Sequence, residues 1–184
     1  MKILLGVTGS VAAILTPKLI EELLAMGSEI KVVATEKSFY FLNPDRINRN
    51  AGPVYMDKDE WWSERYIRGT NILHISLRDW ADVLLIAPLS ANSLAKLANG
   101  LADNFLTSIA RAWPVNKPII LAPAMNTEMW NHPITAEHIE RLKKWFPKLR
   151  IINPISKVLA CGTEGIGAMA EIDSIVKEVR ECAP

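Results

Sequence analysis

The sequence predicts an α/β protein built on a doubly wound parallel sheet, and two observations lead to this prediction. Short continuous apolar runs, the pattern of strands covered on both faces, recur along the chain. Segments with helical spacing separate them, and strands that alternate with helices form parallel sheets with right-handed crossovers. Helices on both faces give a Rossmann/flavodoxin-like three-layer sandwich. The 184 residues suffice for one core, so we expect a single domain over residues 1–184.

The first forty residues predict a strand, a helix and a second strand. Lys2 to Val7 is a continuous apolar run, and the Thr8-Gly9-Ser10 turn after it ends in a residue that can cap a helix. Apolar side chains then recur at helical spacing, and Pro17 is expected to kink this helix or to delay its regular part. The second strand is expected from Ile30 to Ala34.

The same alternation returns in the second half of the chain. We expect strands at Asp82 to Pro88, Pro118 to Ala122 and Ile151-Ile152, and helices after a Ser90 cap, from Thr135 to Trp145 and from Ser174 to Glu181. Two regions interrupt it, a polar stretch over residues 43–71 and a glycine-punctuated run over residues 156–170. Long irregular segments in compact domains are often functional loops or covers. The charged run 57–60 is expected to form a solvated face.

Charge and composition exclude several classes of protein. Twenty-one basic and 20 acidic residues give a net charge of +1, so neither nucleic acid nor an anionic membrane is expected as a partner, and a small-molecule substrate stays open. No apolar stretch approaches the roughly 18 residues that span a bilayer. Two cysteines are too few for a disulfide framework and indicate a reduced, cytoplasmic setting. No histidine pair and no CxxC has metal-site spacing, so no metal is expected.

Small hydroxyl and amide residues dominate the segments that leave the predicted strands. In a doubly wound sheet, ligands bind beyond the carboxyl ends of the strands. Backbone N–H groups at helix N-termini favour anions, which indicates a phosphate-bearing cofactor. The first turn lacks a full dinucleotide fingerprint and a Walker lysine, so a purely structural role for Gly9 stays open, as does Glu36 as a ribose ligand. These segments are Thr8 to Ser10, Thr35-Glu36, Pro88 to Ser93 and Pro123 to Asn126.

His74 and Cys161 stand out by their positions in the sequence. Alternation over Leu73 to Leu77 would place His74 on the face opposite Ile75, just before a strand. A buried, hydrogen-bonded histidine is the alternative interpretation. Cys161 opens the glycine-rich run, and its alternative is an inert core residue.

Four motifs in this order resemble the flavin-containing cysteine decarboxylases, and the resemblance extends from Ile3 to Glu171. It implies an FMN enzyme that oxidises the thiol of 4′-phosphopantothenoylcysteine, releases CO2 and re-reduces the enethiolate, a step of coenzyme A biosynthesis. It also implies a homotrimer or larger assembly with the flavin near a subunit boundary. The motifs are Gly6 to Ala13, Ala87 to Ser93, Pro123 to Trp130 and Leu159 to Gly162.

The resemblance also assigns roles to residues of this sequence. His74 would be the catalytic base, Asn126 would bind the substrate carboxylate, and Met125 would shape the pocket. Cys161 would be the acid that protonates the reduced intermediate. Phe41 or His74 could serve the site of a neighbouring subunit. The residues that would hold FMN are Gly9, Ser10, Thr35, Phe41, Ser90, Ala91, Asn92 and Ser93.

Two positions depart from the family pattern, and three related functions stay open. Asp79 follows Arg78 where a second basic residue is common, and Leu15 replaces a lysine, so the anionic contacts of the substrate are not assigned. A contact to the substrate phosphate could come from the arginines of the polar stretch, without a choice among Arg46, Arg49, Arg65 and Arg68. Peptidyl-cysteine decarboxylases release the enethiol and need no Cys161. Flavoproteins that regulate a phosphatase tend to carry long acidic tails. Prenyl-transferring flavoproteins of similar fold match these motifs less well.

Overall fold

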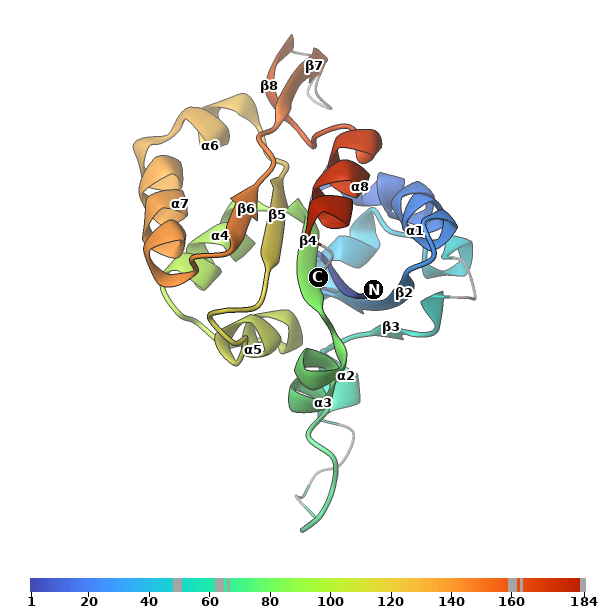
Figure 1. The fold of residues 1–184 in the computed structure, drawn as a ribbon. Coiled ribbons are helices and arrows are strands. Elements are labelled where there is room, and N and C mark those ends of the chain that lie inside the picture. Colours follow the sequence, from blue (N-terminus) through green and yellow to red (C-terminus); the bar gives the residue numbers. More distant parts are fainter. Residues whose placement is uncertain (48–50, 62–64, 66, 159–161, 163, 183–184) are drawn as a thin grey trace.

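A six-stranded parallel sheet, in the order β3-β2-β1-β4-β5-β6, forms the centre of the protein (Figure 1). The computed structural model describes residues 1–47, 51–61, 65, 67–158, 162 and 164–182. Each neighbouring pair of strands runs parallel, as the alternation of strands and helices predicts. The strands are β1 (Lys2–Val7), β2 (Glu29–Ala34), β3 (Val54–Tyr55), β4 (Val83–Leu89), β5 (Ile119–Pro123) and β6 (Leu149–Ile151).

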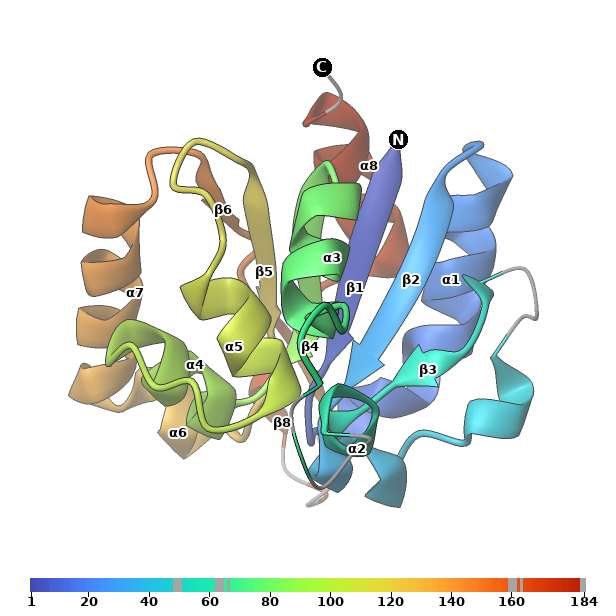
Figure 2. The same ribbon diagram turned by 90° about the horizontal axis from the view of Figure 1, so that it is seen from below.

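Helices cover both faces of this sheet (Figure 2). On one face, α1 (Thr16–Ala25) and α8 (Ile172–Glu181) pack on side chains such as Leu5 and Leu85. The opposite face carries α3 (Leu73–Trp80), α4 (Ala91–Ala98), α5 (Phe105–Arg111) and α7 (Pro133–Trp145), over side chains such as Leu4 and Leu84. Successive strand residues thus supply two separate apolar layers, which confirms the three-layer sandwich.

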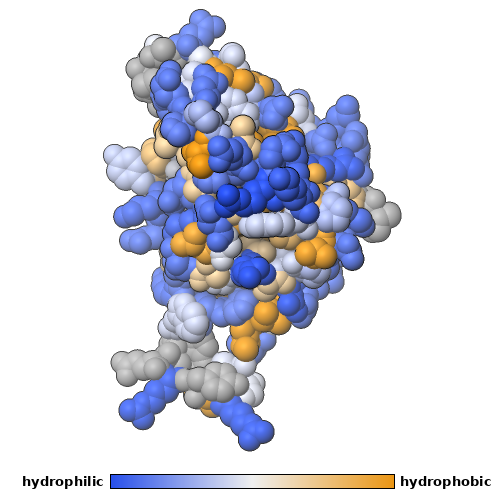
Figure 3. Space-filling view, turned by 90° about the vertical axis from the view of Figure 1, so that its left-hand side faces the viewer, coloured by the Kyte–Doolittle hydropathy of each residue, from blue (hydrophilic) through white to orange (hydrophobic). Residues whose placement is uncertain are grey.

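Shorter elements lie at the ends of the strands. They are the 3-10 helices η1 (Val11–Leu15), η2 (Glu36–Tyr40) and η3 (Pro44–Arg46), the helices α2 (Asp57–Glu60) and α6 (Thr127–Asn131), and an antiparallel hairpin of β7 (Ile155–Val158) and β8 (Glu164–Ala168). The hairpin projects beyond the sheet at one end of the molecule (Figure 1). No described helix is both long and apolar enough to cross a membrane. The exterior in Figure 3 is mostly hydrophilic, with apolar patches separated from one another.

The prediction for Pro17 is confirmed, because the regular helix begins late. A 3-10 turn occupies Val11–Leu15, and Pro17 lies in the first turn of α1, where a missing N–H costs no hydrogen bond. The strand expected at Ile151-Ile152 begins two residues earlier. The helices α5 and α6 are not predicted from sequence; in α5, five of the seven residues are buried, which removes the amphipathic signal.

Two predictions about the polar stretch and its surroundings are wrong. Leu73 to Leu77 belongs to helix α3 rather than to an extended segment, because Leu77 and its neighbours at helical spacing pack on the sheet. The charged run 57–60 is not a solvated face. Asp57 Oδ1 accepts a hydrogen bond from Phe105 N at 2.7 Å, Asp59 Oδ2 accepts one from Met56 N at 2.8 Å, and the Glu60 side chain is 6% exposed.

Candidate functional site

The carboxyl ends of β1, β2, β4 and β5 open onto one cleft. Its volume is about 1060 Å³, at the upper end of the roughly 300–1,000 Å³ found for ligand sites. The chain leaves β1 toward β2 on one side, and β4 lies on the other side of β1, so the strand order reverses between β1 and β4. Ligands of open α/β sheets bind at such a switch point.

Thr8 joins the two central strand exits. This residue is fully buried, and its Oγ1 donates to the Pro88 carbonyl at 2.9 Å while accepting from Ser90 N at 2.7 Å. The hydroxyl group therefore sets the spacing between the turn after β1 and the turn after β4. The turn is predicted from the sequence, but this bridging role of Thr8 is not. A small hydroxyl residue directly after a buried strand could have indicated it.

Gly9 and Ser10 bring the first turn close to two other segments. A Cβ on Gly9 would lie 2.9 Å from the Cβ of Lys37, so glycine allows the turn to approach η2. Ser10 Oγ donates to the Ala124 carbonyl at 3.1 Å and ties the turn to the exit of β5. Because that hydroxyl proton is engaged within the protein, an anion at this turn would depend on backbone N–H groups.

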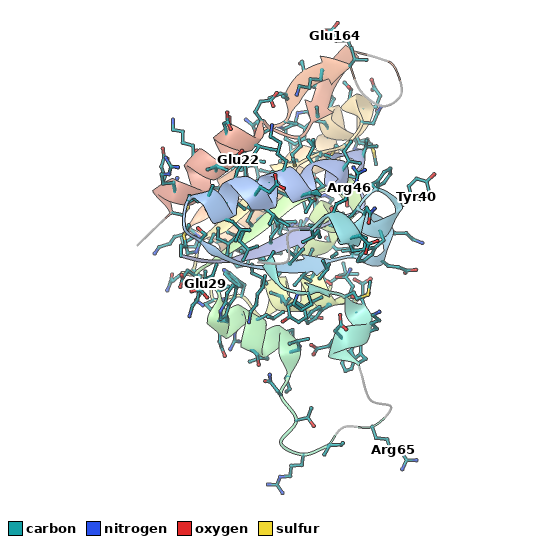
Figure 4. The ribbon with its side chains drawn as sticks, turned by 90° about the vertical axis from the view of Figure 1, so that its right-hand side faces the viewer. Glu22, Glu29, Tyr40, Arg46, Arg65 and Glu164 are labelled. Carbon is teal, nitrogen blue, oxygen red and sulfur yellow. The ribbon has the colours of Figure 1, made fainter. Side chains whose placement is uncertain are left out.

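The exit of β2 supplies Thr35, Lys37 and Phe41 to the cleft. Ser38 Oγ donates to the Thr35 carbonyl at 2.6 Å and holds the start of η2. The Phe41 ring meets Tyr40 edge-on, with ring centroids 4.9 Å apart. Tyr40 itself is 86% exposed and points away from the body of the protein (Figure 4). An apolar ring therefore borders the cleft beside a lysine and a hydroxyl group.

The exit of β4 presents a capped helix N-terminus. Ser90 is the N-cap of α4, and its Oγ accepts a hydrogen bond from Ser93 N at 3.2 Å, which confirms the predicted cap. Ala91, Asn92 and Ser93 line the cleft together with Ser90. The first turn of α4 thus faces the cavity with its positive dipole end.

Met125 and Asn126 lie where β5 ends. Asn126 is the N-cap of α6, and its Oδ1 accepts from Glu128 N at 2.9 Å. Met125 N donates to the Gly167 carbonyl at 2.9 Å, so strand β8 is attached to this loop. Gly167 has φ +146°, and a Cβ there would lie 2.1 Å from the Met125 carbonyl oxygen. Glycine at 167 is therefore what lets the hairpin form one wall of the cleft.

All eight residues that are expected to hold the cofactor line this cleft, and so do Met125 and Asn126. His74 is not among its described lining residues. The imidazole lies in the first turn of α3, and its Nδ1 is 2.5 Å from Oε1 of Glu60. Cys161 lies outside the described residues, between the two strands of the hairpin.

The second cysteine, Cys182, is far from the cleft. It is the C-cap of α8, and Figure 2 shows that this end of α8 lies beside the N-terminus, opposite the strand exits. Burial raises the pKa of the Cys182 thiol.

Three lysines, rather than the arginines of the polar stretch, provide positive charge at the cleft. Lys96 and Lys157 pair with acidic residues, and the hydrogen bond from Lys96 lowers the pKa of Asp103. Lys37 has no ion-pair partner within the described parts of the chain. Sequence reasoning missed Lys37, although it follows a predicted strand exit. Arg65 lies away from the body of the protein (Figure 4), Arg46 and Arg68 are absent from the described lining, and Arg49 is outside the described residues.

These residues fit a flavin phosphate cofactor. Backbone N–H groups, a helix N-terminus and Lys37 suit a phosphate group, and the apolar ring of Phe41 suits a planar aromatic system. The volume leaves room for a substrate beside the cofactor. The architecture is that of a doubly wound α/β protein with a cofactor cleft at its switch point.

Comparison with known proteins gives the family. The family model described as Flavoprotein matches residues 1–183, and the chain belongs to this family. A curated phosphopantothenoylcysteine decarboxylase from Mus musculus is 47% identical over 184 residues, covering 97% of this chain and 85% of the relative.

Two solved structures are also similar. One is a PPC decarboxylase mutant complexed with pantothenoylaminoethenethiol, with a TM-score of 0.91 and 46% identity, covering 98% of this chain and 96% of that chain. The other is the FMN binding protein AtHal3, with a TM-score of 0.87 and 47% identity, covering 98% and 95% respectively. Both likenesses extend over the strand exits and the hairpin.

Replacing Thr8 with valine should weaken both the fold and the cofactor cleft. Thr8→Val keeps the shape but leaves Ser90 N–H without its acceptor, which should lower the free energy of unfolding by about 1–3 kcal/mol. Thr8→Ser retains the hydroxyl and serves as the control. Urea unfolding at one protein concentration measures stability, and flavin titration should show weaker binding for the valine variant only. Equal stability of the two variants would contradict the bridging role.

Proposed function

We propose that this protein catalyses the FMN-dependent decarboxylation of 4′-phosphopantothenoylcysteine to 4′-phosphopantetheine in coenzyme A biosynthesis. The observation that carries the proposal is the convergence of four strand exits, which brings the eight expected cofactor residues and Met125 and Asn126 onto one cleft. The mouse decarboxylase aligns with 97% of the chain. The proposed enzyme acts as one domain over residues 1–184 in the cytoplasm, a setting that agrees with its two cysteines.

Decarboxylation of an acylated cysteine needs an acceptor for the electron pair that remains on Cα. Oxidation of the side-chain thiol to a thioaldehyde creates a C=S group beta to the carboxylate, and this group can accept the pair. Bound FMN supplies this oxidation and afterwards returns the same two electrons. The overall reaction is therefore a decarboxylation in which FMN undergoes no net oxidation or reduction.

Asn126 is suited to hold the substrate carboxylate. Its Oδ1 accepts a hydrogen bond from Glu128 N, so the amide NH2 group is the part of this side chain that can donate to a carboxylate. A neutral donor orients a carboxylate without the tight ion pair that would oppose the departure of CO2. We assign to Met125, next to it on the cleft wall, the shaping of the pocket.

We assign proton removal to His74 and proton delivery to Cys161. Imidazole accepts protons at neutral pH, and a cysteine thiol can donate one to an enethiolate. In the sequence Cys161 falls between β7 and β8, and Lys157, Val158 and Gly167 of these two strands line the cleft. A peptidyl-cysteine decarboxylase would release the enethiol instead, so proton delivery distinguishes the two functions.

The position of His74 supports an assembly in which this residue serves a neighbouring protomer, as a homotrimer would allow. His74 is absent from the described lining of its own cleft. Large apolar side chains around the cleft are unusually exposed, and a partner subunit would cover them. They are Val11 at 43%, Ile14 at 58%, Leu15 at 39%, Met129 at 50% and Val158 at 72% exposed.

Incubation with the proposed substrate tests the function directly. The purified protein should be yellow, bind FMN on titration and release CO2 from 4′-phosphopantothenoylcysteine. A peptide that ends in cysteine is the control substrate and should be turned over far more slowly. A protein that binds no FMN, or that prefers the peptide, would contradict the proposal.

Replacing Cys161 with serine should separate the two halves of the reaction. Cys161→Ser should still release CO2 but give a product that lacks two electrons relative to the normal one, because the enethiolate is not protonated. The two electrons then stay on the flavin, so one equivalent should form per bound FMN unless dissolved dioxygen reoxidises it. Mass spectrometry distinguishes the two products by two hydrogen atoms. Cys182→Ser is the matched control and should give normal product. Normal product from the Cys161 variant would exclude its role as the acid.

Mixing two inactive variants tests whether His74 serves a neighbour. His74→Asn removes the base, and Asn126→Asp keeps the helix cap but places a negative charge against the substrate carboxylate. Each alone should retain FMN and lose turnover. Co-refolded mixtures should regain activity, because about a quarter of sites in a randomly mixed ring would combine both intact residues. Mixtures as inactive as their parents would mean that each protomer uses its own His74.

A further inference from the structure

Glu60 holds His74 through two hydrogen bonds. The carboxylate is the last residue of α2, and its Oε2 accepts from the backbone N–H of His74 at 2.9 Å. The other oxygen, Oε1, is 2.5 Å from Nδ1 of the same residue. The Glu60 side chain is 6% exposed and that of His74 is 24% exposed. A single buried carboxylate therefore fixes both the helix start and the ring of His74.

This contact determines which ring nitrogen carries the hydrogen. An ionised carboxylate only accepts hydrogen bonds, so Nδ1 must be the donor. In a neutral imidazole the other nitrogen, Nε2, then carries the lone pair. Within the described residues Nε2 has no hydrogen-bond partner. The nitrogen that can take a proton from a substrate is thus directed away from Glu60.

The rest of the structure keeps Glu60 in this position. Asp57, one turn earlier on α2, accepts from Phe105 N at the start of α5 and also borders the cleft. Asp59 closes the first turn of α2 by accepting from Met56 N. The N–H group that Glu60 accepts belongs to the first turn of the eight-residue helix α3, where a negative charge is favourable. The helices α2 and α3 contact each other.

We propose that Glu60 is a positioning residue that sets the tautomer and orientation of His74 for proton transfer. The inference rests on the proposed function, since it concerns the base of that reaction. Glu60 touches neither substrate nor cofactor in this role and acts only through the imidazole. A carboxylate that served only as a helix cap would need the backbone contact and not the contact with Nδ1.

Glutamine at position 60 separates the two roles. In Glu60→Gln, the amide oxygen can still accept from the backbone N–H, but the NH2 group then faces Nδ1 and donates to it. His74 should change to the tautomer protonated at Nε2, which cannot accept a proton there. We expect kcat to fall by about 100-fold or more, with little change in KM, FMN affinity or unfolding free energy. Asp59→Asn is the matched control, because the amide oxygen of asparagine can still accept from Met56 N and keep α2 closed, so kcat should be retained.

Nitrogen-15 NMR of histidine-labelled holoenzyme reads the tautomer without any substrate. The chain has only three histidines, and the Nδ1 atom of His132 accepts from Ile134 N at 3.3 Å, so His132 provides a reference ring protonated at Nε2. Wild-type His74 should show the opposite pattern at a pH where the rings are neutral. In Glu60→Gln it should match His132, and His74→Asn assigns the signal.

The outcomes distinguish this inference from the proposed function. Wild-type His74 protonated at Nε2, or Glu60→Gln with unchanged tautomer and unchanged kcat, would overturn the positioning role in an active enzyme. The wild-type spectrum alone suffices for this test should the glutamine variant fail to fold. A wild type that releases no CO2 from 4′-phosphopantothenoylcysteine would overturn the proposed function itself, and with it the catalytic purpose of Glu60.

Discussion

The hydroxyl group of Thr8 connects the ends of β1 and β4, the two neighbouring strands between which the strand order of the sheet reverses. Its two hydrogen bonds join the Pro88 carbonyl and Ser90 N–H to the turn after β1. Ser10 extends this connection to β5 through the Ala124 carbonyl. Side-chain hydroxyl groups therefore connect three strand exits to one another. A cofactor that binds there meets donors already in place.

Much of this arrangement could be predicted from the sequence because strands buried on both faces leave an unmistakable pattern. The apolar runs that end at Val7, Ala34 and Pro88 mark where each strand stops, to within one residue, and the polar residues that follow are then placed at one edge of the sheet. Ser90 as a helix cap needed only local information. The sandwich and the cofactor side of the cleft therefore follow from local patterns together with the rule for parallel sheets.

The remainder depends on contacts between segments that are far apart in the sequence. Alternation over five residues before Trp80 fits a strand as well as a helix, and only packing of Leu77 on the sheet decides for the helix. Glu60 lies in a charged run and pairs with a residue fourteen positions away, so no local pattern indicates its burial. Lys37 approaches Gly9 only because β1 and β2 are neighbours.

The hydrogen bonds between Glu60 and His74 also close the intervening segment into a loop with tied ends. The two residues are fourteen positions apart, and the segment between them carries Arg65 away from the body of the protein (Figure 4). Doubling the length of such a loop costs only about 0.6 kcal/mol in closure entropy. Insertions and deletions here should leave the imidazole where it is. Evolution could therefore vary this part of the surface, and the partners it meets, independently of the chemistry.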